Sequence, residues 1–229
     1  MNLAMPSGTV MALVLAIRLP RSEPAAPLPY GQMLLSLGRL FRVHPVLRRA
    51  GWTQGLLFGA FVAFWAEVAL FLEQPPFDQG SAVAGLLGLL GVAGILVAPL
   101  AGRFVDRLGG GPGPLVIGGA GLVAVAFLLF ALFPTSWGAL IGGIVIMDIG
   151  VQASMIANQS RIYALDAAAR SRCNTVFMTV MFGCGALGSA VGAEAFARFG
   201  WTGLSLLGAG CAGLACALEL GAGRRRASR

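Results

Sequence analysis

The sequence predicts an all-α membrane protein, a six-helix transmembrane bundle preceded by a partial N-terminal helix. Hydrophobic residues make up 57% of the 229 residues and charged residues only 11%, which leaves too little polar surface for a water-soluble globule of this length. The apolar residues fall in runs of about 20, the length of a helix that crosses a bilayer. The runs are uninterrupted, whereas a membrane β-barrel needs short alternating segments.

Residues 1–19 are interpreted as the end of a transmembrane helix. The apolar stretch is short, and its arginines follow it instead of preceding it, which argues against a secretory signal peptide. Residues 20–50 are interpreted as a cytoplasmic linker that begins with the proline-rich stretch Pro20–Pro29. Tyr30–Arg49 then alternates leucines with arginines, a pattern typical of a helix on the membrane surface. The alternative for this stretch is a solvated linker.

Residues 51–220 form the predicted six-helix transmembrane domain, followed by a basic cytoplasmic tail at 221–229. Each apolar run has the length of one membrane-spanning helix. The six runs are Trp52–Leu72, Ala82–Ala101, Leu115–Phe133, Trp137–Ala157, Thr175–Ala195 and Trp201–Leu220.

The arginines predict how these helices are oriented. All sixteen basic residues are arginine, and fifteen of them fall in alternate gaps between the runs, which leaves only Arg198 on the other side. By the positive-inside rule, the arginine-bearing gaps and the C-terminus face the cytoplasm. We therefore expect a multi-pass membrane protein with a cytoplasmic C-terminus. The arginines form no continuous basic stripe, so we expect no nucleic-acid partner.

Small residues recur at helical spacing within the runs, as they do where helix backbones approach closely in lipid. The alternative is that glycine, with 34 residues, is simply abundant. The rows are Gly51, Gly55, Gly59 and Ala63; Gly85, Gly88, Gly91 and Gly94; and the pair Gly188 and Gly192.

Two acidic residues lie inside the predicted spans. Glu67 continues the first small-residue row by one more step of four, so it should point toward a neighbouring helix. Asp148 lies near the middle of its span, and Gln152 and Gln159 share its helical face. Because a charge inside a bilayer is costly, such residues usually line an ion or substrate path. We expect these four residues to line a transport path; the alternative is a hydrogen bond between helices that only fixes packing.

No pattern predicts an enzyme active site, a metal site or a cofactor. The four cysteines have neither CxxC spacing nor histidine partners, and His44 is the only histidine. The glycine-rich turn at 109–114 lacks the ending of a phosphate-binding loop. Glu194 and Glu219 lie near the ends of their predicted spans, so we expect both to reach water at the membrane interface.

The gap after residue 101 carries the pattern Gly-x-x-x-Asp-Arg-x-Gly. Its residues are Gly102, Asp106, Arg107 and Gly109. The pattern resembles the cytoplasmic loop between the second and third helices of each six-helix half in the major facilitator superfamily, which implies that these residues form a gating loop. The family pattern usually continues with two basic residues, and this chain has Gly110 and Gly111 instead.

A second resemblance concerns the stretch from Asn158 to Thr179. It is similar to the loop between helices ten and eleven in efflux-type bacterial members of this superfamily. The resemblance implies a cytoplasmic gate formed by Asn158, Arg161, Asp166 and Arg170. The alternative is that its arginines are positive-inside anchors.

The resemblance implies that residues 3–220 correspond to the end of helix six, the central linker and helices seven to twelve of a twelve-helix carrier. The implied function is secondary active transport in a bacterial inner membrane, as a permease of the antiporter type that couples small-molecule efflux to protons. The implied partners are the bilayer, the substrate, protons, and a missing N-terminal half or a second copy; no cofactor is implied. Two alternatives remain, a six-helix permease subunit driven by a separate ATPase and a non-transporting remnant or interaction protein.

Overall fold

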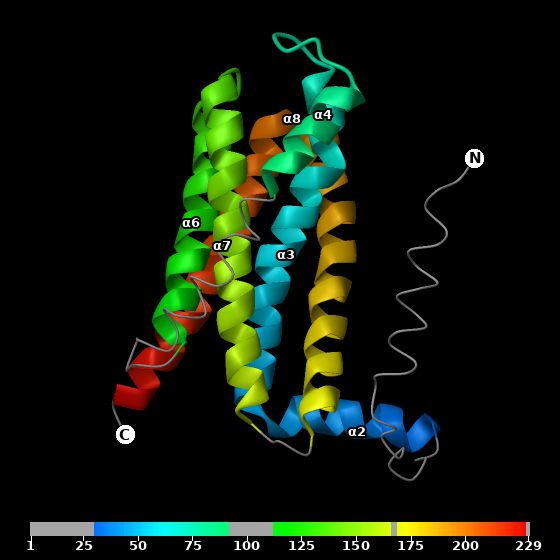
Figure 1. Cartoon of the computed structure of the whole chain (residues 1–229), viewed down its shortest axis with the longest axis vertical. Coiled ribbons are helices and arrows are strands. Elements are labelled where there is room, and N and C mark those ends of the chain that lie inside the picture. Colours follow the sequence, from blue (N-terminus) through cyan, green and yellow to red (C-terminus); the bar gives the residue numbers. More distant parts are fainter. Residues whose placement is uncertain (1–29, 92–111, 166–168, 228–229) are drawn as a thin grey trace, which may run out of the picture. The chain divides into compact units, whose positions relative to one another are not determined.

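The computed structural model describes residues 30–91, 112–165 and 169–227, with side-chain exposure for 35–91, 112–165 and 169–222. The chain divides into two units, residues 1–35 and 36–229, and the helical bundle belongs to the second unit (Figure 1). The gating-loop residues Gly102, Asp106, Arg107 and Gly109 lie outside the described residues, as does Asp166 of the predicted gate.

The described residues form helices and contain no strand, which confirms the all-α prediction. The elements are α2 (Tyr30–Val43), α3 (Pro45–Leu72), α4 (Ser81–Gly88), the 3-10 turn η1 (Leu89–Gly91), α6 (Gly113–Leu132), α7 (Trp137–Tyr163) and α8 (Arg170–Ala227). Judged by length and composition, four helical stretches could cross a membrane: Pro45–Leu72, Gly113–Leu132, Trp137–Tyr163 and Arg170–Ala222. The predicted span Ala82–Ala101 is described only as far as Gly91, as the shorter apolar helix Ser81–Gly91.

α3 begins earlier than the sequence suggests. Pro45 occupies the first helical position, where its missing N–H is not needed, and it holds His44 in an extended conformation with φ −98° and ψ 97°. The predicted surface helix Tyr30–Arg49 is therefore wrong at its end. α2 stops at Val43, and Arg48 and Arg49 belong to the first turns of α3.

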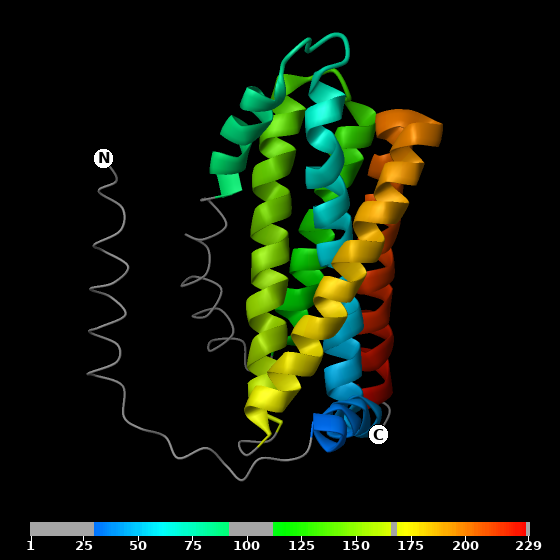
Figure 2. The same cartoon turned by 90° about the vertical axis from the view of Figure 1, so that its right-hand side faces the viewer.

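α8 is two helices joined at Gly200. Gly200 has φ 63° and ψ −161°, a conformation that only glycine adopts without strain. The two segments correspond to the predicted spans Thr175–Ala195 and Trp201–Leu220. In Figures 1 and 2 the first segment is yellow to gold and the second orange to red, and the two meet at one end of the bundle and diverge toward the other.

Small residues bring α3 and the first segment of α8 into backbone contact, as predicted. A methyl group built at Gly188 would lie 2.3 Å from the carbonyl oxygen of Gly59, and one at Gly192 would lie 2.6 Å from the Cβ of Ala63. Among the described residues, no atom lies within 4 Å of a methyl group built at Gly85 or Gly88 of α4, and Gly94 of the same row lies outside the described residues.

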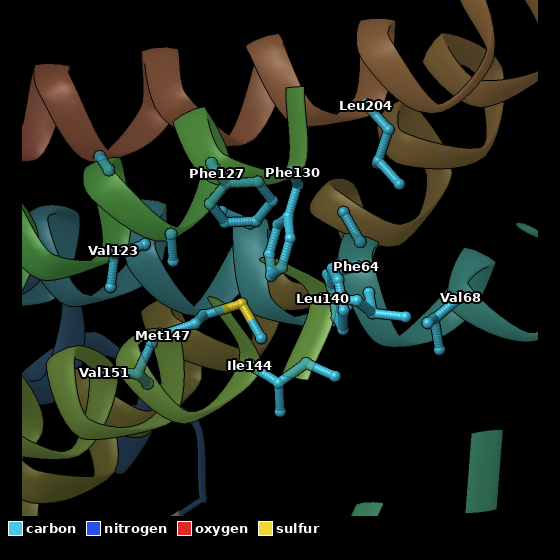
Figure 3. Close-up of a cluster of buried hydrophobic side chains, with 14 of the residues drawn as sticks. Phe64, Val68, Val123, Phe127, Phe130, Leu140, Ile144, Met147, Val151 and Leu204 are labelled. Atoms are coloured by element: carbon cyan, nitrogen blue, oxygen red, sulfur yellow. The ribbon is translucent and has the colours of Figure 1, made fainter. Parts of the chain in front are cut away.

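Four helices meet in a core that is rich in aromatic rings. Phe64 of α3 stacks on Phe130 of α6 with ring centroids 4.8 Å apart, and Phe127 meets Phe130 edge to face. Figure 3 shows these rings together with Ile144 and Met147 of α7 and with Leu204 of α8. This core packs α3, α6, α7 and α8 against one another.

Candidate functional site

Asp148 lies at the wall of a cavity between α3, α7 and the α4–η1 segment. The cavity has a volume of about 490 Å³, and the side chain of Asp148 is buried at 6% exposure. The cavity is lined by Phe61, Val62, Trp65, Ala66, Gly88, Gly91 and Asp148. Asp148 is thus the only lining residue, among those described, that carries a charge.

Two polar atoms at this cavity have no hydrogen-bond partner among the described residues. They are the Oδ2 atom of Asp148, an acceptor, and the Nε1 atom of Trp65, a donor, and both atoms are buried. A buried polar group without a partner costs about 1–3 kcal/mol. Both atoms belong to residues that line the same cavity, but each atom itself is almost inaccessible to solvent.

The indole of Trp65 is held in place by aromatic neighbours on its own helix. Its ring meets Phe64 edge to face at 5.4 Å between centroids, and Phe61 at 6.3 Å. Phe64 is fully buried in the core described above. The orientation of Trp65 therefore depends on the core, although the indole itself is only partly buried.

The structure separates the other predicted path residues from this cavity. Gln152 and Gln159 are half-buried on α7, and neither lines the cavity. Glu67 is buried at 7% exposure, which confirms that it points inward. It lies one turn beyond Ala63, on the face of α3 that packs against α8. Trp65 lies on a different part of α3 and lines the cavity together with Asp148 of α7. The structure thus brings Asp148 together with Trp65, a residue that the sequence did not single out.

A second polar site joins α3, α7 and the second segment of α8. Arg161 donates from Nη1 to Oε1 of Glu219 at 2.9 Å, and Thr53 donates its hydroxyl proton to the same oxygen at 3.2 Å. Arg49 completes the group, with its Nε atom 3.6 Å from that oxygen. The Glu219 side chain is 3% exposed and that of Arg161 is 6% exposed. We call these four residues the ion-pair cluster.

The ion-pair cluster corrects one prediction. Glu219 was expected at the membrane interface, and it is buried in the bundle at 4% exposure. α8 continues to Ala227, so Glu219 lies two turns inside its helix and two arginines from other helices hold its charge. Glu194, by contrast, is exposed and pairs with Arg198 one turn further along the helix.

The predicted gate residues separate into two places. Asn158 is fully buried and donates from Nδ2 to Oε1 of Gln54 at 3.2 Å, while Gln54 donates to the carbonyl oxygen of Val151 at 3.4 Å. This pair lies one turn from Arg161 on α7, so both predicted residues belong to one buried polar region. Arg170 is exposed at the start of α8, where its Nε atom donates to the carbonyl oxygen of Tyr163 at 3.2 Å.

The sequence contained signals for the residues that we missed. Thr53 and Gln54 are polar residues next to the small-residue row of α3, and Glu219 is the only acid in its predicted span. Their pairing was not predictable, because their partners lie on other helices. Among the described residues, no three of histidine, cysteine, aspartate and glutamate come together as a metal site would require.

Comparison with known proteins places this architecture in a family. The Major Facilitator Superfamily model matches residues 3–193. The chain is 37% identical over 200 residues to the uncharacterized transporter YgaY of Escherichia coli O157:H7, which covers 87% of this chain and 50% of that protein. It is 36% identical over 198 residues to the probable transporter SCO4007 of Streptomyces coelicolor, covering 85% of this chain and 45% of that protein.

The chain therefore spans half or slightly less than half of the length of these curated relatives. The family model covers most of the chain, and the apolar helices agree with a multi-pass membrane protein. The chain belongs to the Major Facilitator Superfamily.

Proposed function

We propose that this chain acts as the C-terminal six-helix half of a secondary active transporter that exports a small molecule in exchange for protons. The observation that carries the proposal is Asp148, a buried carboxylate whose Oδ2 atom has no partner among the described residues and whose side chain lines a cavity. Family membership and relatives named as transporters support a transport role.

A carboxylate at this depth is suited to exchange chemistry. An acidic residue near the middle of a membrane-spanning helix costs about 2.5–3.5 kcal/mol on insertion scales, and the cost falls when it binds a proton or a cation. Asp148 has no cation within ion-pair distance among the described residues. It can therefore alternate between a protonated state and a state that binds a ligand, as the access of water to the cavity changes.

The ion-pair cluster is proposed as a latch at the cytoplasmic end of the bundle. Glu219 joins α3, α7 and α8 through Arg49, Arg161 and Thr53. Burying an ion pair costs desolvation energy that nearly cancels the attraction between the charges, so a closed, buried pair and an open, hydrated pair can have similar free energies. A transporter that alternates access needs such a balance between its open and closed ends.

The other predicted residues enter this proposal with separate roles. Asn158 supports the latch from one turn away on α7. Glu67, Gln152 and Gln159 remain predicted members of the path, and Arg170 remains a predicted gate residue. The loop with Gly102, Asp106, Arg107 and Gly109, together with Asp166, remains a prediction from the family resemblance.

The test is a flux measurement in liposomes with an imposed pH gradient. The chain is reconstituted alone and together with the separately produced N-terminal half of the relative SCO4007. Lumenal pH is followed while a panel of small molecules is added. We expect Asp148→Asn to abolish substrate-induced proton movement, because an amide neither binds nor releases a proton at neutral pH and has no charge.

The matched control is Glu73→Gln, which makes the same change at an exposed position after the end of α3. This variant should retain the flux of the original chain. Wild-type proton movement in Asp148→Asn would refute the role assigned to Asp148. A failure of every compound to move protons in both preparations of the unaltered chain would refute the carrier proposal.

A further inference from the structure

Another cavity of the bundle is an apolar groove along α3. It has a volume of about 260 Å³ and is lined by α3 and by both segments of α8, with Leu56, Leu187 and Leu207 among the lining residues. In Figure 2 the two segments of α8 diverge toward the end at which α3 begins, and α3 is seen between them. Among the described residues that line this cavity, no side chain is charged or carries a hydroxyl or an amide. We call it the α3–α8 groove.

The dimensions of the groove fit a single hydrocarbon chain. Along α3 it extends from Trp52 to Ala63, a helix rise of about 16 Å, which is about the hydrocarbon depth of one leaflet of a bilayer. Its volume of about 260 Å³ lies below the range of about 300–1,000 Å³ that is usual for small-molecule sites. A helix is about 10–12 Å in diameter with its side chains, so the same length of helix would need far more volume.

Trp52 marks the end of the groove at the first turns of α3. Its side chain is 49% exposed, and its ring meets Phe41 of α2 edge to face at 6.4 Å between centroids. A partly exposed tryptophan, with an apolar ring and a polar N–H, is typical of the boundary between hydrocarbon and headgroups. The groove therefore ends at the level where lipid headgroups lie.

Two arginines lie just outside this end of the groove. Arg48 precedes Trp52 by four residues and shares its face of α3, and side chains lean toward the N-terminus of their helix, away from the groove. Arg48 donates from Nη1 to the carbonyl oxygen of Arg42, an exposed arginine in the last turn of α2. Among the described residues neither arginine has a carboxylate within ion-pair distance, whereas Arg49 pairs with Glu219. Two cations without a counter-ion thus stand at the mouth of an apolar groove.

We propose that the α3–α8 groove binds one anionic phospholipid, with an acyl chain along α3 and the phosphate on Arg42 and Arg48. Such a lipid has the same division as the site, hydrocarbon over one leaflet depth and then a negative charge. Apolar contacts gain little over the surrounding lipid, so the groove sets the position of the chain and the arginines supply the preference for an anion. The inference goes beyond the proposed function, because lipid binding requires neither a substrate nor a proton.

The first test measures which lipids the full chain retains in detergent micelles, by titration and native mass spectrometry. Dipalmitoyl phosphatidylglycerol is the complete probe. Dipalmitoyl phosphatidylcholine has the same phosphate without net charge, dipalmitoylglycerol has the chains alone, and glycerol phosphate has the phosphate alone. We expect one molecule of phosphatidylglycerol to bind most tightly, and dipalmitoylglycerol and glycerol phosphate to bind most weakly. If phosphatidylglycerol shows no preference over dipalmitoylglycerol, the proposal is wrong.

The arginines are tested with Arg42→Gln and Arg48→Gln, alone and combined. Each should weaken phosphatidylglycerol about fivefold, the value of one arginine at an anionic membrane surface, and leave dipalmitoylglycerol unchanged. Arg48→Lys keeps the charge and should retain binding. Arg172→Gln is the matched control, because Arg172 is exposed near the start of α8 and lies outside the groove. Equal weakening in this control would show a response to overall charge and would overturn the site.

The hydrocarbon part is tested with Leu207→Trp, which places an indole in the groove. Its matched control is Leu206→Trp, since the neighbouring Leu206 is 56% exposed and lies outside the groove. Leu207→Trp should weaken every diacyl lipid about fivefold or more, the lower end of an overpacking cost, and the control should not. Phosphatidylglycerol with a diazirine in its acyl chain should cross-link to residues 184–191 and 207–211. Cross-links spread evenly over the exposed apolar surface would mean unspecific annular lipid and would overturn the proposal.

Two other occupants of the site would also be recognised. If the chain forms a lipid-free dimer that Leu207→Trp separates and Leu206→Trp does not, a second copy covers the groove and the proposal is wrong. If glycerol phosphate binds as tightly as phosphatidylglycerol, the arginines bind a free phosphate and the groove has no part in it. Thermal unfolding establishes that each variant is folded, and the arginine variants decide the question if Leu207→Trp does not fold.

Discussion

Glu219→Gln tests whether the ion-pair cluster stabilises the bundle. The substitution keeps the size of the side chain and one acceptor oxygen, so Thr53 retains a partner, but it removes the charge. Arg161, whose side chain is 6% exposed, then loses the carboxylate 2.9 Å away, and Arg49 loses it at 3.6 Å. Removing one partner of a buried ion pair costs about 3–5 kcal/mol, because the remaining charge stays buried. We expect a loss near the lower value, since Arg49 is partly exposed.

The measurement is reversible unfolding in mixed micelles with a rising fraction of denaturing detergent. Glu194→Gln provides a matched control, because it removes a carboxylate from the first segment of α8, where the ion pair with Arg198 is exposed. Exposed ion pairs contribute about 0–1 kcal/mol to the free energy of unfolding, so this variant should be nearly as stable as the original chain. A double-mutant cycle with Arg161→Gln should show a coupling energy of about 1–3 kcal/mol.

Two results would refute the reasoning. The first is a loss in Glu219→Gln no larger than in Glu194→Gln, which would mean that Glu219 is hydrated and does not depend on its arginines. The second is strict additivity in the cycle, which would mean that Glu219 and Arg161 do not interact directly. In either case the latch assigned to these residues would lose its physical basis.

Three further predictions concern glycines of α8. Gly188→Ala should destabilise the protein by about 1–3 kcal/mol, the usual cost of overpacking, because its methyl group would lie 2.3 Å from the carbonyl oxygen of Gly59. Gly183→Ala, with no described atom within 4 Å, should be neutral or stabilising by up to about 1 kcal/mol. Gly200→Ala should cost about 1–3 kcal/mol from its backbone conformation alone, φ 63° and ψ −161°, since the space around it is open. Detergent unfolding measures all three, and equal stability of the Gly188 and Gly183 variants would contradict the proposed α3–α8 contact.

Local patterns in the sequence predicted much of the fold. The length of the apolar runs predicted helices that could span a membrane, and the four-residue spacing from Gly51 to Ala63 predicted the face of α3 that packs on another helix. The same spacing predicted that Glu67 points inward, and its side chain is buried. These inferences succeed because a helix repeats every 3.6 residues, so the face of a residue follows from its position in its own run.

Local patterns are not sufficient where a partner decides the outcome. The row Gly85, Gly88 and Gly91 has helical spacing, yet a methyl group at Gly85 or Gly88 would meet no described atom within 4 Å. Spacing indicates which residues share a face, but it does not indicate whether another helix covers that face. Proline chemistry at Pro45 likewise moved the start of α3, although the alternation of leucine and arginine continued through it.

The sequence by itself determined the class of the protein, the position of most helices and the depth of Asp148 within its helix. Only the tertiary structure decided which side chains meet. Glu219 pairs with Arg161, 58 positions away, and Trp65 of α3 lines the same cavity as Asp148 of α7. The physical reason is range: hydrophobicity and helical period act within one run, whereas ion pairs and cavities depend on how separate helices are packed and rotated against one another.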